Sequence, residues 1–169
     1  KLINTGFRGM GIKANAVYNL TVRAKDPKGI SNVHFTLIDA DGNTLGSTSI
    51  TPSGEGWKEY TARFVASATE PKARLQITFE GSGTVDLDMI SLFPQDTWKG
   101  RPKGLRKDLV QFLYDLNPGF LRFPGGCIVE GRTLARRYQW KKTVGPIEYR
   151  EYLVNRWNTE FKHRPTLDY

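Results

Sequence analysis

The sequence predicts a mainly β fold, in which an antiparallel β-sandwich of the jelly-roll type precedes an incomplete α/β segment. Three observations lead to this prediction. Short stretches that alternate apolar and polar residues recur through residues 1–93, separated by turns rich in glycine, asparagine and proline. From residue 94 the pattern changes to a run with helical spacing. That run is followed by a short apolar stretch ending in two adjacent glycines, an order typical of α/β proteins.

The strands of the predicted sandwich are recognised by their period of two, which places alternate side chains on one buried face. They are expected at residues 17–24, 33–38, 45–50, 57–64, 74–79 and 84–92. Turn residues lie between them, as at 26–29 and in the Asp-Gly-Asn triplet at 41–43, which tolerates positive φ angles. Residues 1–93 therefore form the predicted β-sandwich domain.

The second segment, residues 94–169, begins with a predicted amphipathic helix. Its apolar residues stand at 105, 109, 112, 113 and 116, and Asn117-Pro118-Gly119 ends it. A short strand is expected at 120–123, and loops with short helices from Gly131 onwards. A single parallel strand needs neighbours on both sides and helices over it. This segment is therefore expected to be incomplete, or to pack against the sandwich.

Charge and composition exclude several classes of function. The net charge is +8, and the 25 Lys and Arg residues are concentrated beyond residue 95. That part of the chain contains fifteen of them and eight Asp and Glu residues. A nucleic-acid surface would explain this, but the basic residues are scattered, which favours solvated helix faces and no nucleic-acid partner. No apolar run reaches the roughly 20 residues of a membrane span. A single cysteine excludes a disulfide framework, and the first residues lack the apolar region of a signal peptide.

The most informative stretch for chemistry is 122–131, where the predicted strand ends at Gly125-Gly126 and is followed by Cys127 and Glu130. Glycines allow the backbone to approach a ligand, and active sites of barrel enzymes lie at the carboxyl ends of strands. A tight turn with an incidental thiol fits the same residues. Cys127 is not expected to be a nucleophile, because nothing in the sequence places His34 or His163 beside it as a base.

Two groups in the predicted sandwich are candidates for ligand binding. Trp57, Tyr60 and Phe64 could form a sugar platform, but Trp57 and Tyr60 are three residues apart and so lie on opposite faces of a strand, which favours core packing. Asp86 and Asp88 point to one face and are weak candidates for a structural calcium ion. Calcium prefers six to eight oxygen ligands, and two carboxylates supply few of them.

A series of ordered motifs beyond residue 86 resembles family 51 α-L-arabinofuranosidases. The motifs are Asp-Thr-Trp-Lys-Gly-Arg at 96–101, Gly-Leu-Arg-Lys-Asp-Leu at 104–109, Leu-Asn-Pro-Gly-Phe-Leu-Arg-Phe-Pro-Gly-Gly-Cys at 116–127, Glu-Gly at 130–131, Tyr-Gln-Trp-Lys-Lys-Thr-Val-Gly-Pro at 138–146, and Arg-Trp-Asn at 156–158. Residues 85–92 are similar to the last strand of the carbohydrate-binding-like sandwich in one branch of this family.

The resemblance implies that residues 94–169 are the start of a (β/α)8 barrel in a retaining glycosidase. Such an enzyme releases terminal α-L-arabinofuranose from arabinoxylan, arabinan and arabino-oligosaccharides. Two carboxylates about 5 Å apart perform this chemistry, one as nucleophile and one as acid/base. In the family both are Glu residues on later barrel strands, so the resemblance gives this chain no catalytic residue, and Glu130 is not a substitute.

The resemblance also implies which residues contact the sugar. The position of Cys127 is a substrate contact occupied by Cys or Asn in the family, and Arg122, Gly125 and Gly126 shape its loop. Trp140 lies in a motif near the sugar. The expected partners are arabinose-containing saccharides and the remainder of the barrel, with no cofactor beyond a possible structural calcium, and the expected location is extracellular or periplasmic. The alternative is a non-catalytic carbohydrate-binding module.

Overall fold

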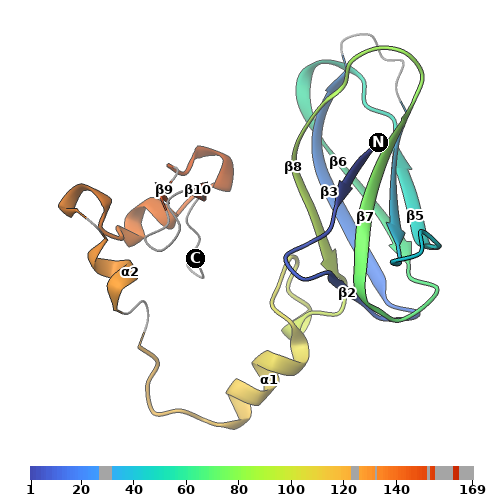
Figure 1. Ribbon diagram of the computed structural model, residues 1–169. Helices are drawn as coiled ribbons and strands as arrows, with labels where there is room; N and C mark the ends of the chain where they lie inside the picture. The colour runs from blue at the N-terminus through green and yellow to red at the C-terminus, as the bar shows by residue number, and fades with distance from the viewer. Residues whose placement is uncertain (27–31, 123–125, 132, 152, 155–161, 164–169) are drawn as a thin grey trace. The chain divides into compact units, whose positions relative to one another are not determined.

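The computed structural model describes residues 1–26, 32–122, 126–131, 133–151, 153–154 and 162–163. These residues form two compact units, which comprise residues 1–116 and 117–169 (Figure 1). The predicted domain boundary between residues 93 and 94 stays a prediction. The predicted turn at 26–29 beyond Asp26, the residues Phe123 to Gly125 and the motif at 156–158 lie outside the described residues.

The first unit contains two antiparallel sheets (Figure 1). The larger sheet has the strand order β1-β7-β4-β5, and β2 also pairs with β7; the smaller has the order β6-β3-β8. The strands are β1 (Leu2–Asn4), β2 (Met10–Ile12), β3 (Val17–Asp26), β4 (Asn32–Ile38), β5 (Thr44–Ile50), β6 (Gly54–Val65), β7 (Glu70–Glu80) and β8 (Asp86–Pro94). Every strand pairing described is antiparallel, so the prediction of a mainly β, antiparallel fold is confirmed.

A single hydrophobic cluster contains side chains from both sheets. Its members follow the alternation seen in the sequence, because every second side chain of a strand points to the same face. In β3 the even-numbered residues from Tyr18 to Asp26 are buried, whereas in β4 and β7 the odd-numbered residues are buried, from Val33 to Leu37 and from Ala73 to Ile77. The most buried members include Leu20, Val22, Val33, Phe35, Leu37, Ala73, Leu75 and Ile77. Apolar burial of this kind is the main driving force for the folding of this unit.

The odd-numbered residues of β3 from Asn19 to Lys25 point away from the core and carry the polar face of the smaller sheet. Asn19 lies between Arg63 of β6 and Phe93 of β8, and Thr21 lies between Thr61 and Ser91. A β-bulge in β8 follows the second of these rows, at the point where Met89 adopts a φ of 51°. This face is described further below, because it carries a hollow.

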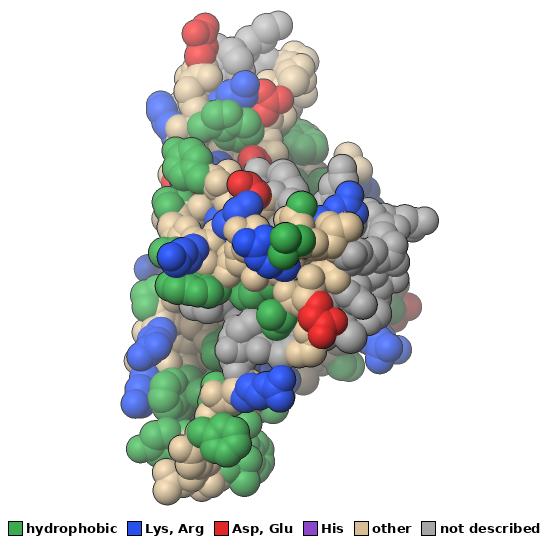
Figure 2. Space-filling model, turned by 90° about the vertical axis from the view of Figure 1, so that its left-hand side faces the viewer, with side chains coloured by type: hydrophobic (Ala, Val, Ile, Leu, Met, Phe, Trp, Pro, Cys, Tyr) green, Lys and Arg blue, Asp and Glu red, His purple; other side chains and the backbone are tan. Residues whose placement is uncertain are grey.

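The first unit ends in a short 3-10 turn, η1 (Trp98–Gly100), and the helix α1 (Lys107–Asp115). This confirms the predicted helix, and Asn117, with a φ of 44°, follows its end. None of the helical residues is buried. Its apolar face is exposed instead, with exposed fractions from 53% to 74% for Leu105, Leu109, Phe112, Leu113 and Leu116. Figure 2 shows hydrophobic side chains gathered at the height that α1 occupies in Figure 1.

The second unit consists of short elements, as expected for loops and short helices. They are α2 (Cys127–Glu130), η2 (Leu134–Arg136), η3 (Trp140–Thr143), η4 (Ile147–Tyr149), β9 (Leu153–Val154) and β10 (Lys162–His163). Among the described helices of the two units, none is long and apolar enough to span a membrane.

One sequence prediction needs correction, and two short strands had not been predicted. The strand expected at 120–123 is not formed by Phe120, Leu121 or Arg122, which are irregular and highly exposed. The physical reason is that a strand of this kind requires neighbouring strands, and the described residues supply none for it. Conversely, β1 and β2 were not expected, because three residues are too few to show a period of two.

Candidate functional site

The outward face of the smaller sheet presents polar side chains in rows across its strands. The row formed by Arg63, Asn19 and Phe93 is followed, two residues further along β3, by the row formed by Thr61, Thr21 and Ser91. Further rows contain Glu59, Arg23 and Asp88, and then Lys25 with Asp86. Successive rows lie about 7 Å apart, because a strand rises about 3.4 Å per residue. The rows together form a polar strip along β3.

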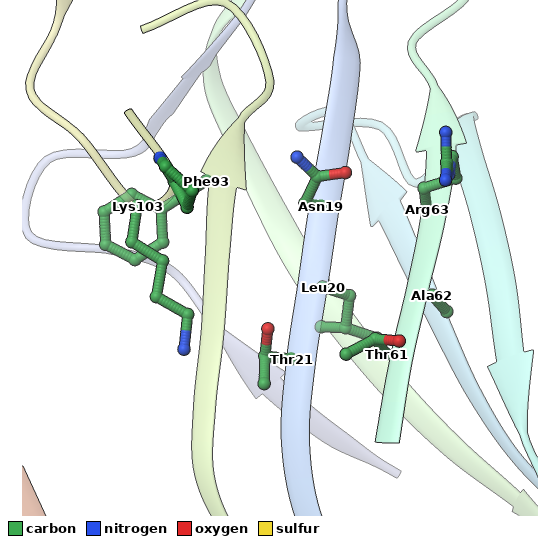
Figure 3. Close-up of a pocket in the computed structure, with 9 residues that line it drawn as sticks. Asn19, Leu20, Thr21, Thr61, Ala62, Arg63, Phe93 and Lys103 are labelled. Atoms are coloured by element: carbon green, nitrogen blue, oxygen red, sulfur yellow. The ribbon is translucent and has the colours of Figure 1, made fainter. Parts of the chain in front are cut away.

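A hollow of about 360 Å³ lies at one end of this strip. The two rows nearest the end of the sheet form its floor, and the chain segment that follows β8 contributes its wall. Figure 3 shows the side chains of three neighbouring strands together with Lys103, and the lining consists of Asn19, Leu20, Thr21, Thr61, Ala62, Arg63, Phe93, Pro102 and Lys103. The hollow is therefore lined by hydroxyl and amide groups, one aromatic ring and two cations.

The other end of the strip carries an aromatic side chain beside an ion pair. Lys25 Nζ lies 3.0 Å from a carboxylate oxygen of Asp86 and 5.3 Å from the ring centroid of Trp57. The Trp57 ring is about half exposed, whereas Tyr60 and Phe64 of the same strand face the core. Trp57 and Tyr60 thus lie on opposite faces, as expected, and the three aromatic residues do not form one platform. The prediction of core packing is wrong for Trp57, which lies on the outward face.

The predicted calcium ligands are engaged in other interactions. Asp86 pairs with Lys25, and Asp88 accepts a hydrogen bond of 2.7 Å from the backbone N–H of Met89. No group of three or more His, Cys, Asp or Glu side chains suited to a metal occurs among the described residues. A lysine ammonium group beside one of only two carboxylates does not fit a calcium ion, which needs more oxygen ligands than these two residues offer.

The second unit holds the residues that the sequence singles out for substrate contact. Gly126 adopts a φ of 65° directly before α2, whose first residue is Cys127. The side chain of Cys127 lies outside the described part of the chain, as does Gly125. The positive φ angle accounts for a glycine at position 126, since other residues rarely adopt it.

A backbone contact connects α2 to the segment that carries Trp140. The N–H of Tyr138 donates a hydrogen bond of 3.0 Å to the carbonyl oxygen of Val129, two residues beyond Cys127. Gly131, with a φ of 67°, allows the turn between them, because a Cβ atom there would clash with the carbonyl group of Arg136. Cys127 and Trp140 therefore belong to two segments that a local hydrogen bond holds together.

The remaining candidates of this unit are exposed. Trp140 begins η3 and is 57% exposed, and its carbonyl oxygen accepts a hydrogen bond of 2.6 Å from the hydroxyl group of Thr143. Arg122 is exposed and precedes the residues that the structure does not describe. Glu130 is exposed at the end of α2. The exposed indole ring of Trp140 and the guanidinium group of Arg122 can therefore contact a ligand or another segment of a protein.

Sequence reasoning missed the residues that line the hollow. The alternation of β3 contained one signal, because its outward positions from Asn19 to Lys25 are all polar. Arg63 could have been placed beside Asn19 only by pairing β3 with β6. Lys103 reaches the hollow because of the path that the chain takes after β8, and no local sequence pattern predicts that path.

Comparisons with known proteins agree with the motifs. The family model described as "Alpha-L-arabinofuranosidase 1 domain" matches residues 112–165. An extracellular exo-α-L-arabinofuranosidase of Streptomyces chartreusis is 38% identical over 165 residues, covering 91% of this chain and 19% of the relative. α-L-Arabinofuranosidase 1 of Arabidopsis thaliana is 38% identical over 151 residues, covering 87% of this chain and 22% of the relative.

A solved structure is also similar to this chain. It is an arabinose-bound family 51 α-L-arabinofuranosidase, with a TM-score of 0.81 and 29% sequence identity, and the match covers 96% of this chain and 27% of that one. The chain thus spans about a fifth of the length of the two sequence relatives and about a quarter of the solved structure.

Proposed function

We propose that this chain, which belongs to the family 51 α-L-arabinofuranosidases, is the N-terminal part of a longer retaining α-L-arabinofuranosidase. The longer protein hydrolyses terminal, non-reducing α-L-arabinofuranosyl residues of arabinoxylan, arabinan and arabino-oligosaccharides. The observation that carries this proposal is the similarity to arabinofuranosidases over about nine tenths of the chain, in which motifs from Asp96 to Trp157 occur in order.

The proposed fold has two parts. The two sheets of residues 1–93 form a jelly-roll sandwich of the carbohydrate-binding-module type, and residues 94–169 begin a (β/α)8 barrel. The exposed apolar face of α1 supports the second part, because a soluble protein rarely leaves five neighbouring large apolar side chains in water. The remainder of the barrel is the proposed occupant of that face.

The proposed chemistry is a double displacement with retention of configuration. One carboxylate attacks the anomeric carbon and forms a glycosyl-enzyme, while a second carboxylic acid protonates the leaving oxygen and then activates water. Both carboxylates belong to the proposed remainder of the barrel, so this chain supplies no catalytic residue and its isolated form is proposed to be inactive. The reaction uses carboxylates only and therefore needs no cofactor.

The contribution of this chain to the active site is proposed to be sugar binding. Arg122, Gly126 and Cys127 belong to a loop after residues 120–123, which are proposed to become the first barrel strand only when the remainder of the barrel supplies neighbouring strands. Trp140 contributes from a neighbouring segment. Two observations support this: Gly126 has the backbone conformation of a tight turn, and the Val129–Tyr138 hydrogen bond holds the two segments together. A relative named as extracellular supports an extracellular location over a periplasmic one.

Proton NMR of the longer protein tests the proposed reaction. With an aryl α-L-arabinofuranoside as substrate, the first arabinose formed should be the α-furanose, before mutarotation mixes the anomers. Release of the β-furanose first would show inversion, and no release at all would overturn the proposed activity.

Sugar binding without catalysis is a second candidate function, favoured by the strip along β3. Its exposed indole ring, ion pair and polar hollow resemble a saccharide-binding surface more than a core-packing face. Calorimetry of this chain with arabino- and xylo-oligosaccharides at millimolar concentration tests this candidate function. An absence of binding heat would contradict it.

A further inference from the structure

The hollow at the end of the strip along β3 has an unusual charge. Two of its lining residues, Arg63 and Lys103, are cations, and none is acidic. Within the described residues neither cation has an ion pair or a hydrogen bond with another side chain. Both side chains are exposed, so each can contact a ligand without a rearrangement of the protein. Two unpaired cations around one concavity favour an anionic ligand.

The remaining lining residues favour a sugar over a simple anion. Asn19, Thr21 and Thr61 place one amide and two hydroxyl groups on the floor of the hollow, where they can both donate and accept hydrogen bonds (Figure 3). The half-buried Phe93 adds an apolar ring surface of the kind that sugar rings contact. The volume of about 360 Å³ lies at the lower end of the range for small-molecule sites, about 300–1,000 Å³.

The charges outside the hollow argue against a continuous polyanion. Along the strip, the rows beyond Thr21 contain two cations, Arg23 and Lys25, but three carboxylates, those of Glu59, Asp86 and Asp88. A nucleic acid or a chain with a charge on every unit would carry its negative charges over them. A neutral polysaccharide with a single acidic side group avoids this repulsion, because only the acidic group enters the hollow while the neutral chain follows the strip toward Trp57.

We propose that this hollow binds the uronic acid side group of an otherwise neutral polysaccharide, with Arg63 and Lys103 on its carboxylate and Asn19, Thr21 and Thr61 on its hydroxyl groups. This rests on the second candidate function and names its ligand class. It assigns the sheet a role separate from hydrolysis, in which the protein is held to substituted regions of a polymer.

Calorimetry with a matched pair of saccharides tests the proposal on the whole 169-residue chain. The first is xylotetraose carrying one glucuronic acid side group, and the second is its carboxyl-reduced counterpart, in which the carboxylate is a primary alcohol. The acidic saccharide should bind at least about tenfold more tightly, because the reduced form cannot make charge-assisted hydrogen bonds. Equal affinities would overturn the uronate assignment and leave neutral sugar binding intact, and no heat from either would overturn both.

Charge-removing variants identify the binding site. Arg63→Gln and Lys103→Gln should each weaken binding of the acidic saccharide by about tenfold, and should leave the weaker binding of the reduced saccharide unchanged. Lys72→Gln is the matched control, since it removes one exposed positive charge from β7 of the other sheet. An affinity that is the same in Arg63→Gln, Lys103→Gln and Lys72→Gln would place the ligand elsewhere and overturn the proposal.

Competition separates the saccharide from other anions. Inorganic phosphate and a single-stranded DNA dodecamer, each at the concentration of the acidic saccharide, should displace less than about a tenth of it. Displacement of most of the bound saccharide by either competitor would indicate a general anion site and would contradict the proposal.

Discussion

The indole ring of Trp98 lies against the ring of Tyr114, with 5.9 Å between their centroids, and so connects η1 to α1. Its Nε1 also donates a hydrogen bond of 3.2 Å to the side-chain oxygen of Gln111. The ammonium group of Lys99 lies 4.3 Å from the Trp98 centroid. A helix of nine residues is marginal in water by itself, so these contacts hold α1 in place while its apolar face remains exposed.

Trp98→Ala should therefore loosen α1 without unfolding the sheets. The amide protons of Val110 to Leu113 are expected to exchange at least about tenfold faster, because the stacking and hydrogen-bond contacts of the indole are lost. Hydrogen exchange followed by NMR measures this. Trp57→Ala, which removes an indole from β6, is the control and should leave exchange in α1 unchanged. Equal exchange in both variants would show that Trp98 does not anchor the helix.

Phe112 tests whether the apolar face of α1 is covered in the longer protein. In this chain its side chain is 71% exposed, so Phe112→Ala should change the free energy of unfolding by less than about 0.5 kcal/mol. In the longer protein the same substitution should cost about 3–5 kcal/mol, as for a buried phenylalanine. Chemical denaturation of both proteins measures the difference.

Phe35→Ala supplies the matched control for that comparison. Phe35 is fully buried between the sheets, so its loss should cost about 3–5 kcal/mol in both proteins. A small effect of Phe112→Ala in the longer protein, beside a large effect of Phe35→Ala, would mean that nothing covers α1.

The turn between β4 and β5 should respond to acid through Asp39. The side-chain amide of Asn43 donates a hydrogen bond of 2.8 Å to this carboxylate, and the backbone N–H groups of Asn43 and Asp41 donate two more. These bonds, that of the Asn43 side-chain amide foremost, hold the pKa of Asp39 below its ordinary value. A lowered pKa means that the stabilisation is present above the unfolded pKa and is lost as the pH falls through the folded pKa.

NMR titration of the carboxyl carbon of Asp39 from pH 6 to pH 2 checks this. Asn43→Ala should raise the pKa of Asp39, since the largest stabilising contact of the charged form is removed. A titration curve that coincides with that of the unsubstituted chain would show that Asn43 is not the cause.

Gly131→Ala should disrupt the connection between α2 and the segment of Trp140. The φ of 67° is strained for alanine, and the added methyl group would clash with the carbonyl group of Arg136. Cleavage within residues 126–145 by a protease should become faster. Gly145→Ala has a φ of 93° but open space around the new methyl group, so it should accelerate cleavage less. The reverse order would contradict the assigned role of Gly131.

Cys127 is proposed to bind sugar, not to react with it. In the longer protein, Cys127→Ala should lower kcat/KM for an aryl α-L-arabinofuranoside by about twofold to tenfold, the effect of one lost neutral hydrogen bond. Cys127→Asn should retain most of the activity, because an amide can make the same contact. The pH profile should stay the same in both variants. Complete loss of activity in Cys127→Ala would indicate a nucleophile and would overturn this assignment.

The strands of the two sheets could be predicted because their burial follows a local period. Residues 74–79 alternate in the sequence and lie in β7, where Leu75 and Ile77 are buried as expected and Phe79, near the end of the strand, is 44% exposed. The same reasoning failed at Phe120 to Arg122, because a parallel strand depends on neighbours that a local pattern does not contain. The hollow could not be predicted either, since it depends on the pairing of β3 with β6 and on the approach of Lys103 from beyond β8.

The activity of equal molar amounts of this chain and of the longer protein tests the central claim most directly. Both are assayed with an aryl α-L-arabinofuranoside under the same conditions. The proposed division of the active site predicts steady release of arabinose by the longer protein and none by this chain, which carries the sugar-contacting loop without the two carboxylates. Hydrolysis by this chain that scales with its purity, or an inactive longer protein, would contradict it.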